Sequence, residues 1–142
     1  MNQTPLSGGC QCGGVRYALA GDPVFTAICH CTMCRRASAA PTVAWAMYRE
    51  EQVTLSHTTL HEYQSSADAR RSFCGECGTQ ICFHADYIPG MIDITIGSLD
   101  DPNALEPTLH YWYSKHLSWV RFDDALPKHQ EFPPQDGGET EA

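Results

Sequence analysis

The sequence predicts a mainly β domain with little helix, held together by metal-binding cysteines. The chain has 142 residues, which suits a single domain. Short runs of alternating or β-branched residues recur between Gly, Pro, Asp and Asn, and no stretch has a long apolar period of 3.6 residues. The eight cysteines fall into clusters with the spacing of metal ligands. Together these features favour antiparallel sheets over helix bundles.

Each of these short runs is predicted to be a strand. A brief helix is expected over residues 32–39, where Thr32 could cap the start and Pro41 limits extension. A second helix is expected after Asp101-Pro102. The predicted strands are residues 15–19, 24–29, 42–48, 52–55, 60–64, 71–74, 79–84, 91–99, 108–113 and 118–122.

The charges argue against a nucleic-acid partner. The chain has 17 acidic and 9 basic residues, a formal net charge of −8, which repels a phosphate backbone. Four acids gather near the end, beside Pro133-Pro134 and Gly137-Gly138. We therefore expect one domain over residues 1–128 and a disordered acidic tail over 129–142. The four acids are Glu131, Asp136, Glu139 and Glu141.

The predicted compartment bears on the chemistry of the cysteines. No apolar run approaches the ~20 residues of a membrane helix, so no membrane partner is expected. The first five residues have neither a basic patch nor an apolar stretch, which predicts no signal peptide and a cytoplasmic protein. Thiols stay reduced there, and disulfides within the C-x-C pairs would close strained rings. Metal thiolates are therefore favoured over disulfides.

Two of the cysteine clusters end in a glycine. Gly13 follows Cys12 and Gly78 follows Cys77, and glycine allows the positive-φ turn that aims backbone N–H groups at sulfur. The two clusters together predict a closed, tetrahedral structural zinc that joins two hairpins. Buried thiols without a metal are the alternative. The predicted ligands are Cys10, Cys12, Cys74 and Cys77.

The middle cluster, Cys29, Cys31 and Cys34, offers only three thiols. Three ligands leave one coordination position for an exchangeable group, which is typical of a functional metal. The alternative is that Cys82 or a histidine completes the tetrahedron and the second metal is also architectural. An iron–sulfur cluster is disfavoured because the chain has no ferredoxin run. Cys82 itself is expected to be a small buried strand residue.

Several polar residues could have either a functional or a structural role. His30 lies between two predicted ligands and is expected to point away from the metal, because alternate residues of extended chain do so. Arg35 and Arg36 could offset the negative charge and bind a substrate carboxylate, or form a solvated helix face. His110 and His116 belong to an aromatic stretch that could line a pocket or simply pack in the core.

The chain contains three ordered cysteine motifs, GCQCGGVRY at 9–17, CHCTMCRR at 29–36 and FCGECGT at 73–79. They resemble the glutathione-dependent formaldehyde-activating enzyme family, which also includes centromere protein V. The likeness covers about residues 8–128. It implies a β-tent fold, a structural zinc on the first and third clusters and a second, more labile zinc on the middle cluster. The named activity of the family is the addition of glutathione to formaldehyde, which gives S-hydroxymethylglutathione.

The chemistry of the middle cluster and the resemblance favour an enzyme. A zinc ion with three thiolates has a net charge of −1 and is a weak Lewis acid, so it suits deprotonation of an incoming thiol. We expect two zinc ions per chain and a carbon–sulfur lyase-type reaction at Cys29, Cys31 and Cys34. The expected substrates are glutathione or a similar thiol and formaldehyde or another small aldehyde, which form or release an S-hydroxymethyl adduct. A noncatalytic, zinc-stabilised binding module is the alternative.

Overall fold

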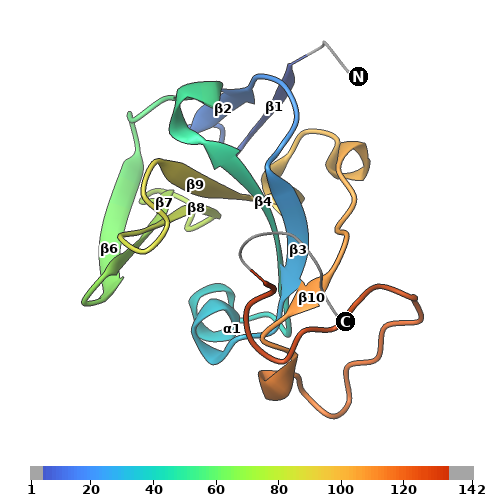
Figure 1. Cartoon of the computed structure of the whole chain (residues 1–142). Coiled ribbons are helices and arrows are strands. Elements are labelled where there is room, and N and C mark those ends of the chain that lie inside the picture. Colours follow the sequence, from blue (N-terminus) through green and yellow to red (C-terminus); the bar gives the residue numbers. More distant parts are fainter. Residues whose placement is uncertain (1–4, 135–142) are drawn as a thin grey trace. The chain divides into compact units, whose positions relative to one another are not determined.

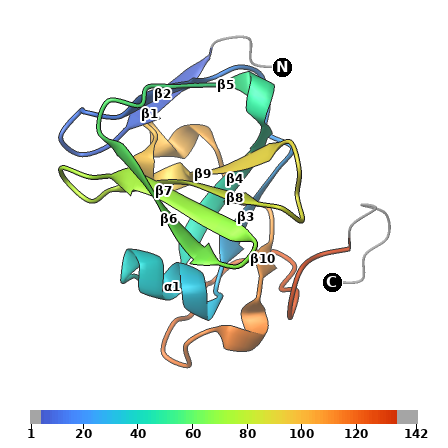
Figure 2. The same ribbon diagram turned by 90° about the vertical axis from the view of Figure 1, so that its left-hand side faces the viewer.

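Strands form most of the regular structure in residues 5–134, the part of the chain that the computed structural model describes (Figures 1 and 2). The mainly β prediction is confirmed, with two sheets and a single α-helix in this range. Contacts divide the chain into two units. Unit 1 comprises Met1–Phe25 and Ala46–Leu105, and unit 2 comprises Thr26–Trp45 and Glu106–Ala142.

A three-stranded antiparallel sheet in unit 1 has the strand order β1-β2-β5. Strand β1 (Leu6–Gly9) forms a hairpin with β2 (Arg16–Leu19), which also pairs with β5 (Val53–Leu55). The sequence did not predict β1, because its glycines have low strand propensity. One of them is required by packing, since a side chain at Gly8 would collide with the ring and hydroxyl of Tyr17.

Four further strands of unit 1 are neighbours in the order β9-β8-β7-β6. They are β6 (Leu60–Ser66), β7 (Ala69–Cys74), β8 (Gln80–Ala85) and β9 (Met91–Thr95), and each adjacent pair is antiparallel. These strands match the runs predicted there, although β9 ends before the predicted residue 99. Fully buried side chains of unit 1 include Val15, Leu19, Tyr48, Ile81 and Ile94.

Unit 2 contains strands in the order β10-β3-β4. Strand β3 (Phe25–Cys29) pairs in parallel with the short β10 (His110–Tyr111), an exception to the antiparallel pattern that the sequence predicts. Strand β4 (Val43–Arg49) begins in this unit and continues into unit 1. The largest fully buried side chains here are those of His30 and His110, so imidazoles occupy places usually taken by apolar groups.

The helix α1 (Thr32–Ser38) confirms the predicted helix, but its cap differs. Cys31, not Thr32, is the N-cap, and its sulfur accepts a hydrogen bond from the Cys34 N–H at 3.2 Å. The second expected helix is a single 3-10 turn, Pro102–Ala104. In the described part of the chain no helix is both long and apolar enough to cross a membrane.

The predicted strand at 118–122 is wrong, because this segment is irregular. Its apolar residues have separate roles. The Phe122 ring packs edge-on against His110, with centroids 4.9 Å apart, whereas Trp119 is 67% exposed. The apolar residues of segment 118–122 therefore do not place it in a sheet.

Part of the expected tail is hydrogen-bonded. The backbone N–H of His129 donates to the His110 carbonyl at 2.9 Å, and that of Trp112 donates to the Glu131 carbonyl at 2.9 Å. The packed chain thus extends past residue 128. Residues 135–142 of the expected tail lie outside the described range.

A buried carboxyl group lies on the β7-β8-β9 surface of unit 1. Arg71 is opposite Phe83, and Phe83 is opposite Asp93. The guanidinium of Arg71 lies 4.8 Å from the centroid of the Phe83 ring. Asp93 is 4% exposed, and its Oδ1 has no hydrogen-bond partner among the described residues. Burial raises the pKa of Asp93 to about 7, although the charge of Arg71 acts in the opposite direction.

Asp93→Asn is expected to remove a pH dependence of stability. Asp93 ionises near pH 4 in the unfolded chain and near 7 in the folded chain, so stability present below pH 4 is lost as the pH rises to 7. The free energy of unfolding of the variant, relative to wild type, should therefore rise by about 2 kcal/mol between pH 5 and pH 7. Urea denaturation at both pH values measures this difference. The exposed control Asp123→Asn should not show it, and a pH-independent difference for Asp93→Asn would contradict the prediction.

Candidate metal centres

Two hairpin turns of unit 1 carry the first group of cysteines. One turn connects β1 with β2, and the other connects β7 with β8. In each turn the glycine after the last cysteine has a positive φ, 86° at Gly13 and 84° at Gly78. Their positions directly after Cys12 and Cys77 predict this conformation, which other residues rarely adopt.

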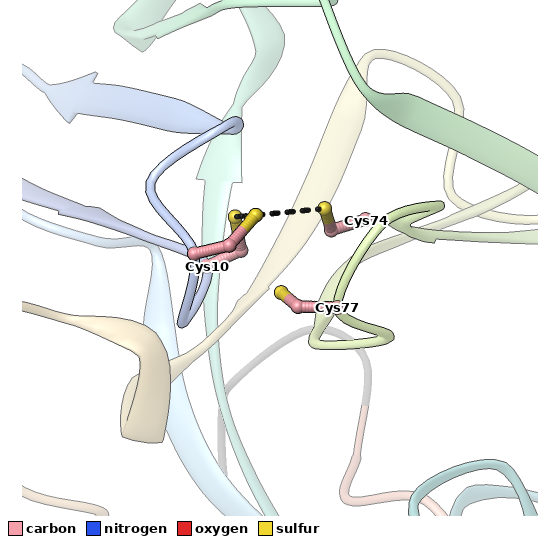
Figure 3. A group of neighbouring side chains, drawn as sticks. Cys10, Cys74 and Cys77 are labelled. Atoms are coloured by element: carbon pink, nitrogen blue, oxygen red, sulfur yellow. Dashed lines mark hydrogen bonds between the residues drawn. The ribbon is translucent and has the colours of Figure 1, made fainter.

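The sulfur atoms of Cys10, Cys12, Cys74 and Cys77, hereafter the four-thiol group, lie within 4.8 Å of one another. Cys12 Sγ is 3.6 Å from Cys10 Sγ and 3.7 Å from Cys74 Sγ. Four sulfurs bound tetrahedrally to zinc lie about 3.8 Å apart, given a Zn–S distance of about 2.3 Å. Figure 3 shows Cys10 facing Cys74 and Cys77 from the opposite turn. No cysteine of the chain forms a disulfide, so all four sulfurs are available to a metal ion. The donor type and the spacing both fit zinc.

Two of these sulfurs accept hydrogen bonds from backbone N–H groups. The Val15 N–H donates to Cys10 Sγ at 3.2 Å, and the Glu76 N–H donates to Cys74 Sγ at 3.3 Å. The Thr59 hydroxyl lies 3.2 Å from Cys74 Sγ. This contact, together with the backbone donors, lowers the pKa of Cys74 although burial acts in the opposite direction. Donors of this kind favour the thiolates that bind metal.

Thr79 links the two turns. Its Oγ1 accepts a hydrogen bond from the Gln11 N–H at 3.1 Å, which leaves the hydroxyl hydrogen for Cys77 Sγ at 3.3 Å. The hydroxyl and backbone N–H of Thr79 lower the pKa of Cys77 to about 5. Sequence reasoning missed both Thr59 and Thr79, and only the adjacency of Thr79 to Gly78 is a visible signal in the sequence.

The second group, Cys29, Cys31 and Cys34, belongs to unit 2 and is hereafter the three-thiol group. Cys29 ends β3, Cys31 caps α1 and Cys34 lies in the first turn of that helix. The three sulfur atoms lie within 4.8 Å of one another. Hydrogen bonds from Cys31 and Cys34, together with burial, raise the pKa of Cys29. A divalent cation would offset this cost, because three thiolates alone repel one another.

The three-thiol group includes no further donor among residues 5–134. Neither Cys82 nor a histidine of the described residues belongs to it. Cys82 is 1% exposed on β8, and burial raises its pKa to about 11. It is the buried strand residue that the sequence predicts.

The other predicted site residues differ in exposure. Arg35 and Arg36 lie in the last turn of α1, where basic residues also complement the helix dipole. Arg36 is exposed, whereas Arg35 is half-buried and its buried Nε has no hydrogen-bond partner among the described residues. His30 turns its ring to His110, with 2.9 Å between Nε2 and Nδ1, and His116 is exposed.

Three comparisons relate the chain to known proteins. A family model described as glutathione-dependent formaldehyde-activating enzyme matches residues 5–115. A protein of Schizosaccharomyces pombe, named as an uncharacterized lyase, is 29% identical over 76 residues, which are 54% of this chain and 55% of that protein. The chain thus spans about half the length of this curated relative.

A crystal structure of a Rhodobacter sphaeroides protein has a similar fold, with a TM-score of 0.58 and 22% sequence identity. The similarity covers 71% of this chain and 96% of that one. An experimentally determined structure therefore has a similar fold over that part of the chain.

Proposed function

The chain belongs to the glutathione-dependent formaldehyde-activating enzyme family, and on this premise we propose that it is a zinc-dependent carbon–sulfur lyase-type enzyme. Its substrates are glutathione or a similar small thiol and formaldehyde or another small aldehyde. It forms or cleaves the S-hydroxymethyl adduct of the two. The relative named as a lyase supports a reaction of this type.

The observation that carries the proposal is the contrast between the two cysteine groups. The four-thiol group supplies a complete tetrahedral set, which suits a structural zinc, whereas the three-thiol group supplies one donor fewer. We assign one zinc ion to each group. A zinc ion held by the three-thiol group would lower the pKa of a small thiol bound to it.

The net reaction forms one bond from sulfur to carbon. The thiol sulfur attacks the carbonyl carbon, the carbonyl π electrons move to oxygen, and the proton lost by sulfur ends on that oxygen. Cys29, Cys31 and Cys34 would hold the zinc ion. Arg35 is the better candidate for binding a glutathione carboxylate, because its Nε is buried without an acceptor among the described residues. Arg36 is exposed, and its interactions are weakened by solvent.

The protein is expected to accelerate the approach to equilibrium between glutathione, formaldehyde and their adduct. The effect should be largest below neutral pH, because an ordinary thiol titrates near ~8.5 and free thiolate is then scarce. Exchange measurements by NMR, with and without protein, give the rate above the uncatalysed reaction. An equilibrium position that shifts in proportion to added protein, at an unchanged rate, would instead indicate the binding module.

A further inference from the structure

The mechanism described above assigns no role to the buried histidines of unit 2. His30 is 1% exposed and His110 is 0% exposed. Burying an imidazole costs free energy unless its nitrogens are hydrogen-bonded, so two such rings in one small unit need an explanation. The rings of Tyr113 and Phe122 pack edge-on against His30, with centroids 4.9 and 5.8 Å away. Trp112, directly before Tyr113, has a φ of 55°, a strained conformation for a residue with a side chain.

The two imidazoles and one carboxylate form a hydrogen-bonded chain. Asp124 Oδ2 lies 3.1 Å from His110 Nε2, and His110 Nδ1 lies 2.9 Å from His30 Nε2. A carboxylate only accepts, so Nε2 of His110 carries a proton, and one further proton lies between the two rings. Both ring orientations are thereby fixed.

Asp124, at the outer end of these hydrogen bonds, is held by several contacts. Asp124 Oδ1 accepts hydrogen bonds from the Leu126 N–H at 3.1 Å and from Lys128 Nζ at 3.2 Å. Burial would raise the pKa of Asp124, but the hydrogen bonds from His110, Leu126 and Lys128 lower it to about 2. The backbone of His110 donates to the Pro127 carbonyl at 2.8 Å. His110 is thus a fixed point to which His30 is attached.

His30 connects these hydrogen bonds to the three-thiol group. Its backbone N–H donates to the Tyr111 carbonyl at 3.1 Å, and its ring binds His110, so one short segment holds both. The backbone stays extended to Cys31, which has φ −67° and ψ 153°. Because alternate side chains of extended chain point to opposite sides, a ring held on one side directs Cys29 and Cys31 to the other.

We propose that His110 and Asp124 are positioning residues of the three-thiol group, which hold His30 and thereby turn Cys29 and Cys31 toward Cys34. The proposal rests on the metal assigned to this group under the proposed function. Nδ1 of His30 has no hydrogen-bond partner among the described residues. Without His110 the buried ring would lose its polar contact, and it could regain one only by moving the backbone between the two cysteines.

Two substitutions of His110 separate its two contacts. Asparagine places a polar atom where Nδ1 lies and can still bind His30, whereas glutamine places it where Nε2 lies. His110→Gln is therefore expected to lower the zinc affinity of the three-thiol group by about 10- to 100-fold, as loss of a supporting hydrogen bond commonly does. His110→Asn should retain more of the affinity. The control His57→Gln changes an exposed histidine of unit 1 and should leave the affinity unchanged.

Zinc affinity is measured by competition with a chromophoric chelator, and the Co²⁺ charge-transfer spectrum reports the arrangement of the thiolates. Circular dichroism and the zinc retained by the four-thiol group show that each variant is folded. A residue with a merely structural role would lower the melting temperature but leave the affinity and spectrum of the folded protein unchanged. Neither measurement uses glutathione or an aldehyde, so failure of this proposal and failure of the proposed reaction are distinguishable.

Asp124→Ala tests the same proposal with both imidazoles in place, should His110→Gln not fold. It is expected to lower zinc affinity about 10-fold, and Asp124→Asn, which keeps an acceptor oxygen, should restore most of it. Wild-type affinity and an unchanged Co²⁺ spectrum in the folded His110 and Asp124 variants would overturn the proposal. Equal losses in His110→Gln and His110→Asn would also overturn it, because the contact to His30 would then be irrelevant.

Discussion

Cys77→Ser is expected to leave most of the chain unfolded. The four-thiol group joins two hairpin turns whose nearest ligands, Cys12 and Cys74, are 62 residues apart in sequence. A structural zinc bound by thiolates contributes on the order of 10 kcal/mol or more, which is comparable with the whole stability of a domain. A serine hydroxyl at position 77 is a poor replacement for a thiolate, so most of that contribution is lost.

Far-UV circular dichroism and the zinc content of the purified variant measure this effect. Cys82→Ser is the matched control. Cys82 is buried and Cys77 is half-buried, but Cys82 belongs to neither metal-binding group. It should fold and keep both zinc ions, at a cost of about 1–3 kcal/mol for burying a hydroxyl. A Cys77→Ser protein with wild-type stability would show that the four-thiol group is not what holds the hairpins.

Cys31→Ser is expected to abolish the proposed acceleration of the reaction between glutathione and formaldehyde, while the fold persists. The three thiols lie within one strand-to-helix connection and clamp no distant segments together. Serine is among the best N-cap residues, so the Cys34 N–H that now donates to sulfur would keep an acceptor and α1 would remain. The variant loses a thiolate ligand, and we expect it to lose the zinc ion that we assign to the three-thiol group.

The expected Cys31→Ser protein has a circular dichroism spectrum close to wild type, one zinc ion per chain, and the uncatalysed rate for glutathione and formaldehyde. In the wild type, a mild chelator should remove one of two zinc ions without unfolding the chain, since the closed four-thiol group binds more tightly. If Cys31→Ser unfolded as completely as Cys77→Ser, the three-thiol group would be architectural and the proposed reaction would lose its site.

The sequence predicted which cysteines lie together because short-range chemistry marks the two turns that carry them. Gly13 and Gly78 directly follow ligands, and their positive φ angles are local properties of the turns. The hydroxyl donors Thr59 and Thr79 could not be found this way. Their contacts to Cys74 and Cys77 depend on how the chain packs, and threonines are common in strands.

Longer-range structure was predicted less well. The strand β1 was missed because packing against Tyr17, not local propensity, makes glycine suitable there. The segment 118–122 was predicted as a strand because its apolar residues resemble one, but Phe122 packs against the two buried histidines instead. His30 was correctly expected to point away from the thiols, yet its hydrogen-bond partner His110 is 80 positions along the chain, so the pairing gave no local signal.

The two-turn construction of the four-thiol group has a consequence for synthesis on the ribosome. Cys10 and Cys12 emerge first, and Cys74 follows Cys12 by 62 residues. At about 5–20 residues per second this interval lasts roughly 3–12 s. Cys29, Cys31 and Cys34 emerge within it, so the nascent chain exposes five thiols before the correct partners of the first two exist. A zinc ion that bound Cys10 and Cys12 during that interval would find only cysteines of the three-thiol group as further ligands, and correct loading of the four-thiol group must follow the emergence of Cys77.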